Sequence, residues 1–193
     1  MRATAALLPV LFACIGLPLG GCAMDEAITN EQTREMGLTS PEVLASLARL
    51  QPGVVAWYRE AERRGLAVGR PLNANETRIA QKVGVAHPER VRLAIDQPIP
   101  LLSDPQTSSR LSDVFGTGSM PGAAATTFGY AIYIGRNYVH DRRMLAHELT
   151  HVGQFEQLGI DGFVHDYLLQ VMLFGYRVAP LERAAAANEH LGK

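Results

Sequence analysis

The chain has 193 residues, of which 47% are hydrophobic and 19% are charged, so it can form a core and is not expected to be disordered throughout. Its formal net charge is −1 and its Lys and Arg residues form no basic block. Nucleic acid is therefore not an expected partner, since phosphate binding needs clustered positive charge. Once a removable leader is set aside, the length suits a single domain.

The first 21 residues have the pattern of an export signal. Arg2 is an early positive charge, an apolar stretch runs from Ala3 to Leu19, and small residues follow. The ending Leu19-Gly20-Gly21-Cys22 resembles the lipobox of bacterial lipoproteins, in which the cysteine carries lipid and becomes the first mature residue. Because Ala23 rather than Asp follows Cys22, the resemblance implies attachment to the outer membrane, facing the periplasm. The alternative is an ordinary secretory signal with an incidental cysteine.

Residues 22–38 are polar and are expected to form a tether, and residues 39–193 the folded domain. The two cysteines of the chain, Cys14 and Cys22, lie in the leader and at the lipidation position. The mature domain then has no thiol for a disulfide or for a thiolate metal site. Any metal must therefore be held by histidines and carboxylates.

The hydrophobic pattern predicts a mostly helical chain with a small sheet. Pro52-Gly53 is expected to break the first helix, and Gly65, Gly159 and Gly175 to end later ones. Helices are expected over 41–50, 54–64, 75–84, 141–158, 161–174 and 180–191, strands over 91–95 and 127–136, and irregular structure over 97–126. This order, helices before and after a little sheet, predicts an α+β domain.

The segment His147-Glu148-Leu149-Thr150-His151 carries the clearest chemistry. Residues four apart share one face of a helix, so the two imidazoles can reach one metal ion, while Glu148 lies at the edge of that face. An apolar stripe beside them would bury the helix against the core; it consists of Leu145, Leu149 and Val152. The alternative is a helix with two incidental histidines.

This segment resembles the zincin metallopeptidases, in which His-Glu-Leu-Thr-His-Val-x-Gln is a recurrent form. The resemblance covers about residues 75–190 and implies a zincin-like fold, with the small sheet packed on the metal-binding helix. It implies zinc (Zn²⁺) on His147 and His151, with Glu148 as the catalytic base. Gln154 and Gln157 stand where the metzincin branch has Gly and His, so the chain is similar to the gluzincin branch.

Gluzincins take a third ligand from a later helix, and Pro180-Leu181-Glu182 resembles the Pro-x-Glu segment that supplies it. Glu182 is therefore the expected third ligand. His165 is its rival, followed by Glu189 and Asp166. His165, Tyr167 and Tyr176 are candidates for binding the substrate oxyanion, because they lie between the ligands in the chain.

The function that the resemblance implies is a lipid-anchored zinc metallopeptidase, in which a zinc-bound water activated by Glu148 hydrolyses peptide bonds. Its substrate would be a peptide or protein of the cell envelope, held in part by edge pairing with the strand at 127–134. The alternative function is a non-catalytic zinc-binding envelope lipoprotein that acts as a binding or scaffold module.

Overall fold

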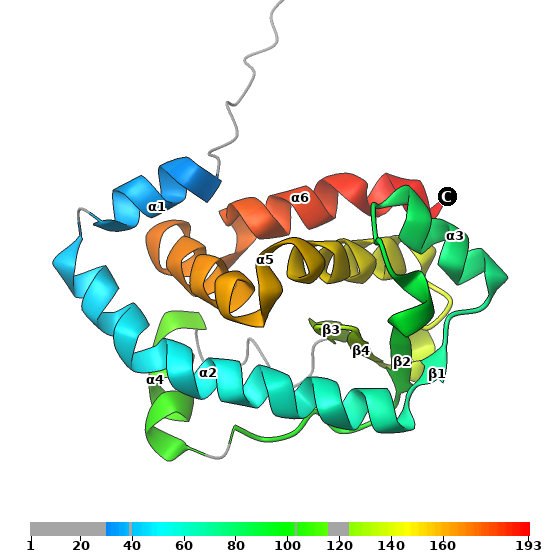
Figure 1. Ribbon diagram of the computed structural model, residues 1–193, viewed down its shortest axis with the longest axis horizontal. Coiled ribbons are helices and arrows are strands. Elements are labelled where there is room, and N and C mark those ends of the chain that lie inside the picture. The colour runs from blue at the N-terminus through cyan, green and yellow to red at the C-terminus, as the bar shows by residue number, and fades with distance from the viewer. Residues whose placement is uncertain (1–29, 39, 103, 116–123) are drawn as a thin grey trace, which may run out of the picture.

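The computed structural model describes residues 30–38, 40–102, 104–115 and 124–193 (Figure 1). The expected signal peptide and Cys22 lie outside these residues. The helices are α1 (Asn30–Leu38), α2 (Pro41–Val68), α3 (Ala74–Lys82), α4 (Pro105–Phe115), α5 (Arg142–Phe174) and α6 (Pro180–Asn188). The strands are β1 (Arg70–Pro71), β2 (Arg92–Ile95), β3 (Ala125–Phe128) and β4 (Ala131–Ile134), and short 3-10 turns include η3 (Tyr176–Val178) and η4 (Glu189–Gly192).

The four strands form one mixed sheet in the order β1-β2-β4-β3. β2 runs parallel to β4, whereas β1 and β3 are antiparallel to their neighbours. β3 therefore lies at an edge of the sheet. The mostly helical α+β class predicted from the sequence is confirmed.

Helix α5 is the centre of the fold, with α6 on one side and α2 on the other (Figure 1). Leu145, Leu149 and Val152 are at most 2% exposed, so the predicted apolar stripe does face the core. It packs against β2, β4 and α3, and the second part of the core lies between α2 and the later half of α5. The sheet therefore lies against the helix that carries both histidines, as expected.

Two glycines divide the later helices as predicted. Gly159 has φ 67° inside α5, which kinks the helix between its two halves. Gly175 has φ 81° and ends α5. Both conformations are unfavourable for residues with a Cβ, which is why glycine marks these points.

The predicted break at Pro52-Gly53 is wrong, because α2 continues through it. Pro52 itself is exposed, while Leu50 and Val54 on either side are buried in the core. Burial of both flanks keeps the helix continuous despite the hydrogen bond that a proline removes.

Regular structure also occurs where none was predicted. α4 lies within the segment 97–126, and Asp104 accepts hydrogen bonds from the backbone N–H groups of Gln106 and Thr107 at its start. α1 lies within the expected tether and is joined to α5 by Arg34, whose guanidinium contacts Asp166 at 2.6 Å. The expected strand 127–136 is instead the hairpin β3–β4, turned at Gly129 with φ 57°.

Within the described residues, no helix combines the length and apolar character needed to cross a bilayer.

Candidate metal centre

Three ligand-type side chains meet between α5 and α6. His147 and His151 stand one turn apart on α5, and Glu182 lies in the first turn of α6, which Pro180 begins. One donor atom from each lies within 4.8 Å of the other two. Nε2 of His151 lies 3.3 Å from Nε2 of His147 and 3.5 Å from Oε1 of Glu182. Two imidazoles and one carboxylate are a donor set that suits zinc, so these residues fit a metal ion.

Glu182 is an anionic member of this group. Burial alone would raise the pKa of its carboxyl, but hydrogen bonds with His147, His151 and Tyr167 lower it by more. The pKa therefore lies well below its usual value. A buried carboxylate that stays ionised beside two imidazoles provides the negative charge that a bound cation needs.

Each histidine also has a partner on Nδ1, the ring nitrogen outside the Nε2 contacts described above. Nδ1 of His151 lies 2.8 Å from the side-chain oxygen of Gln154, and the Gln154 amide donates to the carbonyl oxygen of Leu181 at 3.0 Å. Because an amide oxygen only accepts, Nδ1 of His151 carries the proton and Nε2 keeps its lone pair for a metal. Gln154 lies three residues after His151 on the same helix face, a spacing from which this contact could have been predicted.

Glu189, the first residue of the C-terminal turn η4, lies beside the imidazole of His147. Its Nδ1 lies 3.5 Å from Oε1 of Glu189, whose Oε2 accepts a hydrogen bond from Arg143 at 2.9 Å. Glu189 is a candidate third ligand in the sequence, but the structure places it on the outer nitrogen of His147 instead. A carboxylate in that position fixes the tautomer of a ligating histidine.

Two tyrosines that the sequence suggests as oxyanion donors lie near Glu182. The Tyr167 hydroxyl donates to Oε1 of Glu182 at 2.6 Å, so it is engaged in orienting the carboxylate. Tyr176 lies on the exposed turn η3, where burial and the negative charge of Glu182 raise the pKa of its hydroxyl.

His165 and Asp166, which the sequence also allows as the third ligand, are not members of the donor group. Nδ1 of His165 lies 3.1 Å from Asp166, and Asp166 is paired with Arg34. These residues connect α5 to α1.

Glu148 is buried beside the histidines without joining the donor group. Its Oε2 accepts a hydrogen bond from the Thr127 hydroxyl on β3 at 2.6 Å, and the same hydroxyl lies 3.1 Å from the Glu148 carbonyl oxygen. No sequence pattern indicates this role for Thr127, since it depends on the packing of the edge strand against α5.

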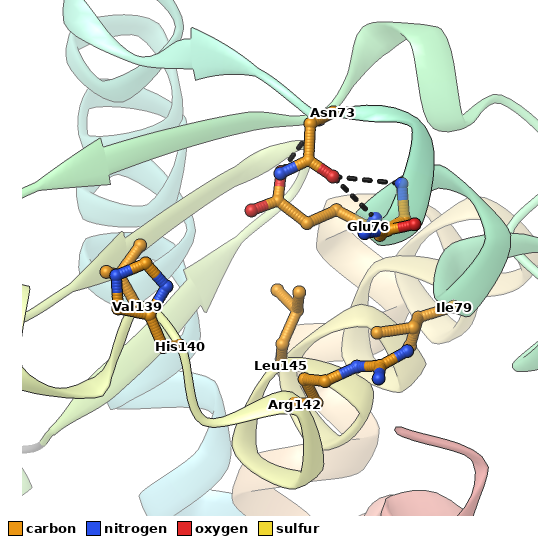
Figure 2. Close-up of a pocket in the computed structure, with 8 residues that line it drawn as sticks. Asn73, Glu76, Ile79, Val139, His140, Arg142 and Leu145 are labelled. Carbon is orange, nitrogen blue, oxygen red and sulfur yellow. Dashed lines mark hydrogen bonds between the residues drawn. The ribbon is translucent and has the colours of Figure 1, made fainter. Parts of the chain in front are cut away.

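A separate cavity of about 170 Å³ lies at the start of α3 and α5 and is lined in part by His140, Arg142 and Leu145 (Figure 2). Its buried carboxylate, Glu76, accepts from the Asn73 backbone N–H at 2.7 Å and pairs with Arg70. Glu76 is thus occupied in holding the start of α3, and the cavity is distinct from the metal centre.

Comparison with known families matches residues 117–159 to a family model described as the eCIS core domain. The match covers less than half of the chain. It includes both strands of the hairpin and the two histidines, and it ends before Glu182. No curated protein and no solved structure matches the chain.

Proposed function

We propose that this protein is a zinc metallopeptidase in which His147, His151 and Glu182 hold the metal and Glu148 is the general base. The observation that carries the proposal is the placement of Glu148. Its carboxylate is buried next to the three donors, is anchored through Oε2 to Thr127, and is not itself one of them. A site that used metal for folding alone would have no need of this second acidic group.

The donor set favours zinc over the harder divalent cations. Magnesium and calcium prefer oxygen ligands throughout, whereas two imidazoles with one carboxylate are typical of catalytic zinc. Three protein ligands also leave a coordination position open. The family matched over residues 117–159 is associated with metallopeptidase-like proteins, which supports the same class of site.

When bound, zinc supplies Lewis acidity toward a carbonyl oxygen and makes water a nucleophile near neutral pH. Glu148 accepts the proton of the attacking water as the new C–O bond forms. It then returns that proton to the amide nitrogen as the C–N bond breaks, giving a carboxylic acid and an amine. Among the described residues no hydrogen bond engages Oε1 of Glu148, so this oxygen is available for the transfer while Thr127 holds Oε2.

Metal analysis of purified variants tests the site. Wild-type protein and Glu148→Gln should each carry about one zinc per chain, whereas His147→Ala and Glu182→Ala should lose it. Zinc retained in Glu182→Ala would remove this residue from the ligand set. Absence of zinc from wild-type protein, even after its addition, would overturn the metallopeptidase proposal.

Hydrolysis separates the enzyme from the alternative, a zinc-binding scaffold. A mixture of envelope peptides incubated with zinc-loaded wild-type protein should be cleaved, and Glu148→Gln should reduce cleavage by at least about a hundredfold at unchanged zinc content. Zinc binding with no cleavage of any peptide would favour the scaffold.

We also propose that the protein is anchored in the bacterial outer membrane, facing the periplasm, through lipid on Cys22. This rests on the sequence alone. Cys22→Ala should release the protein from the membrane fraction and abolish incorporation of labelled fatty acid. Unchanged fractionation and labelling would contradict the anchor and leave the metal centre unaffected.

A further inference from the structure

Tyr58, on α2, has a buried ring and a hydroxyl group that forms no hydrogen bond with any described residue. The side chain is 6% exposed. Two other tyrosines in the interior differ, since Tyr133 donates to the Ala61 carbonyl oxygen at 2.8 Å and Tyr167 donates to Glu182. A buried hydroxyl without a protein partner is costly, and it commonly faces a ligand or a water molecule.

The hydroxyl of Tyr58 borders space that water can enter. Among the described residues, every side-chain nitrogen or oxygen that is fully shielded from solvent has a hydrogen-bond partner. Because the Tyr58 hydroxyl has none, it is not one of these shielded atoms. It therefore reaches the wall of a water-accessible space although its ring is buried.

Ring contacts place Tyr58 one aromatic ring away from His151. Its ring packs edge-on against Phe128 with centroids 4.8 Å apart, and Phe128 directly follows Thr127, which anchors Glu148. On another side it lies 6.3 Å from Phe163, and the Phe163 ring is 6.0 Å from the ring of His151.

Electrostatics agree with this placement. Burial raises the pKa of the Tyr58 hydroxyl, and the negative charges of Glu182 and Glu148 raise it further. Tyr58 is thus within electrostatic reach of both carboxylates of the centre, and it remains a neutral O–H donor at physiological pH.

We infer that Tyr58 is a catalytic residue whose O–H donates a hydrogen bond to the carbonyl oxygen of the scissile amide as negative charge develops there. This assignment rests on the proposed function. No covalent bond of Tyr58 forms or breaks, and its proton stays on the phenol. Of the residues that the sequence suggests for this role, Tyr167 is engaged by Glu182 and His165 by Asp166, and Tyr176 is 48% exposed on the turn η3.

The test compares Tyr58→Phe with Tyr133→Phe, each of which removes one phenolic hydroxyl from a buried ring. Acetohydroxamate serves as the probe, because it binds zinc and presents a carbonyl oxygen at the metal. Its dissociation constant is measured on the zinc-loaded full chain, together with zinc content and melting temperature.

Tyr58→Phe should keep its zinc and its melting temperature, because no internal hydrogen bond is lost, and should bind acetohydroxamate about tenfold more weakly. Tyr133→Phe should have a lower melting temperature and wild-type affinity for the probe. On any peptide that the wild-type protein cleaves, Tyr58→Phe should lower kcat about a hundredfold and change KM little.

Equal probe affinity in Tyr58→Phe and wild-type protein would overturn this role and leave the zinc site intact. Zinc-loaded wild-type protein that fails to bind acetohydroxamate would also overturn it. If the wild-type protein binds no zinc, the proposed function is wrong, and so is this role of Tyr58.

Discussion

At the scale of single residues, the metal affinity of the proposed centre is expected to depend on groups outside the donor set. Oε1 of Glu189 lies 3.5 Å from Nδ1 of His147, a position in which a carboxylate favours the proton on Nδ1 and leaves Nε2 to ligate. Glu189→Ala is expected to weaken zinc binding about tenfold, and Glu189→Gln less, because the amide oxygen still accepts. Competition with a chromophoric chelator measures both affinities.

Arg143 provides the control for this variant. Its side chain is 65% exposed, so its ion pair with Glu189 is expected to contribute little. Arg143→Ala should therefore retain nearly wild-type zinc affinity. If Glu189→Ala binds zinc as well as the wild-type protein and only melts earlier, Glu189 merely docks the C-terminal turn.

Glu76 is expected to make stability depend on pH. Burial raises its pKa, but hydrogen bonds from Arg70 and the Asn73 backbone lower it more, so the folded-state value lies below the usual 4.5. A lowered pKa stabilises the fold fully above about pH 4.5, and this contribution is lost as the pH falls through the folded-state value. Glu76→Gln should cost roughly 1 kcal/mol at pH 7, because Arg70 is partly exposed.

Urea unfolding of wild-type protein and Glu76→Gln at pH 7 and pH 4 checks this dependence. The difference between them should shrink at the lower pH. The surface control is Glu60→Gln, which removes two ion pairs of exposed side chains, with Arg63 and Arg64, and should change stability little at either pH. A Glu76→Gln difference that is the same at both pH values would contradict the expectation.

The three residues of the donor group were predictable from sequence because each signal is local. The spacing of His147 and His151 defines a helix face, and Pro180 marks the start of the helix that carries Glu182. The roles of Thr127 and Tyr58 were not predictable, since β3 and α2 reach the site only through tertiary packing. Tyr167 does lie near the site as its place in the chain suggests, but its partner, Glu182, depends on how α6 folds back on α5.

At the scale of elements, the close contact between η4 and the start of α5 positions Glu189. A Cβ on Gly192 would collide with the carbonyl oxygen of Arg142, which is backbone and cannot move aside cheaply. Gly192→Ala should therefore displace η4, lower the melting temperature and weaken zinc binding. Thermal unfolding and chelator competition on the same preparation measure the two effects.

Gly162→Ala is the matched control, because it adds a methyl group to a glycine within α5. Its Cβ would meet Leu158 at 3.4 Å, an ordinary contact distance. Alanine favours the helix by about 0.5–1 kcal/mol over glycine, so this variant should be slightly more stable and bind zinc normally. If Gly192→Ala binds zinc with wild-type affinity, the position of η4 does not affect the metal centre.

The helices of the second half could be predicted with nearly correct limits, because Gly159 and Gly175 mark ends that the backbone itself requires. The first half was harder. α2 passes through Pro52 because residues far apart in the chain bury both flanks, and no local signal reports that burial. α4 begins at a Pro-rich segment whose composition is typical of loops, although Asp104 caps it.

At the scale of the whole molecule, a metal would join two helices that meet only in the folded chain. α5 supplies both histidines and contacts α2, α6 and the sheet, while Glu182 brings in α6 (Figure 1). Because zinc would bind the folded chain through all three residues, it should stabilise the fold by about 2.7 kcal/mol at a free concentration about 100 times its dissociation constant.

Thermal unfolding over a series of free zinc concentrations, set by a metal buffer, tests this coupling. The melting temperature of wild-type protein should rise with zinc and fall when a chelator removes it. His147→Ala should melt at one temperature at every zinc concentration, because it lacks a ligand. Glu148→Gln should follow the wild-type dependence, since Glu148 is outside the donor group. A wild-type melting temperature that is insensitive to zinc would mean that the three side chains come together without binding the metal, and that Glu182 is held by Tyr167 and the two histidines alone.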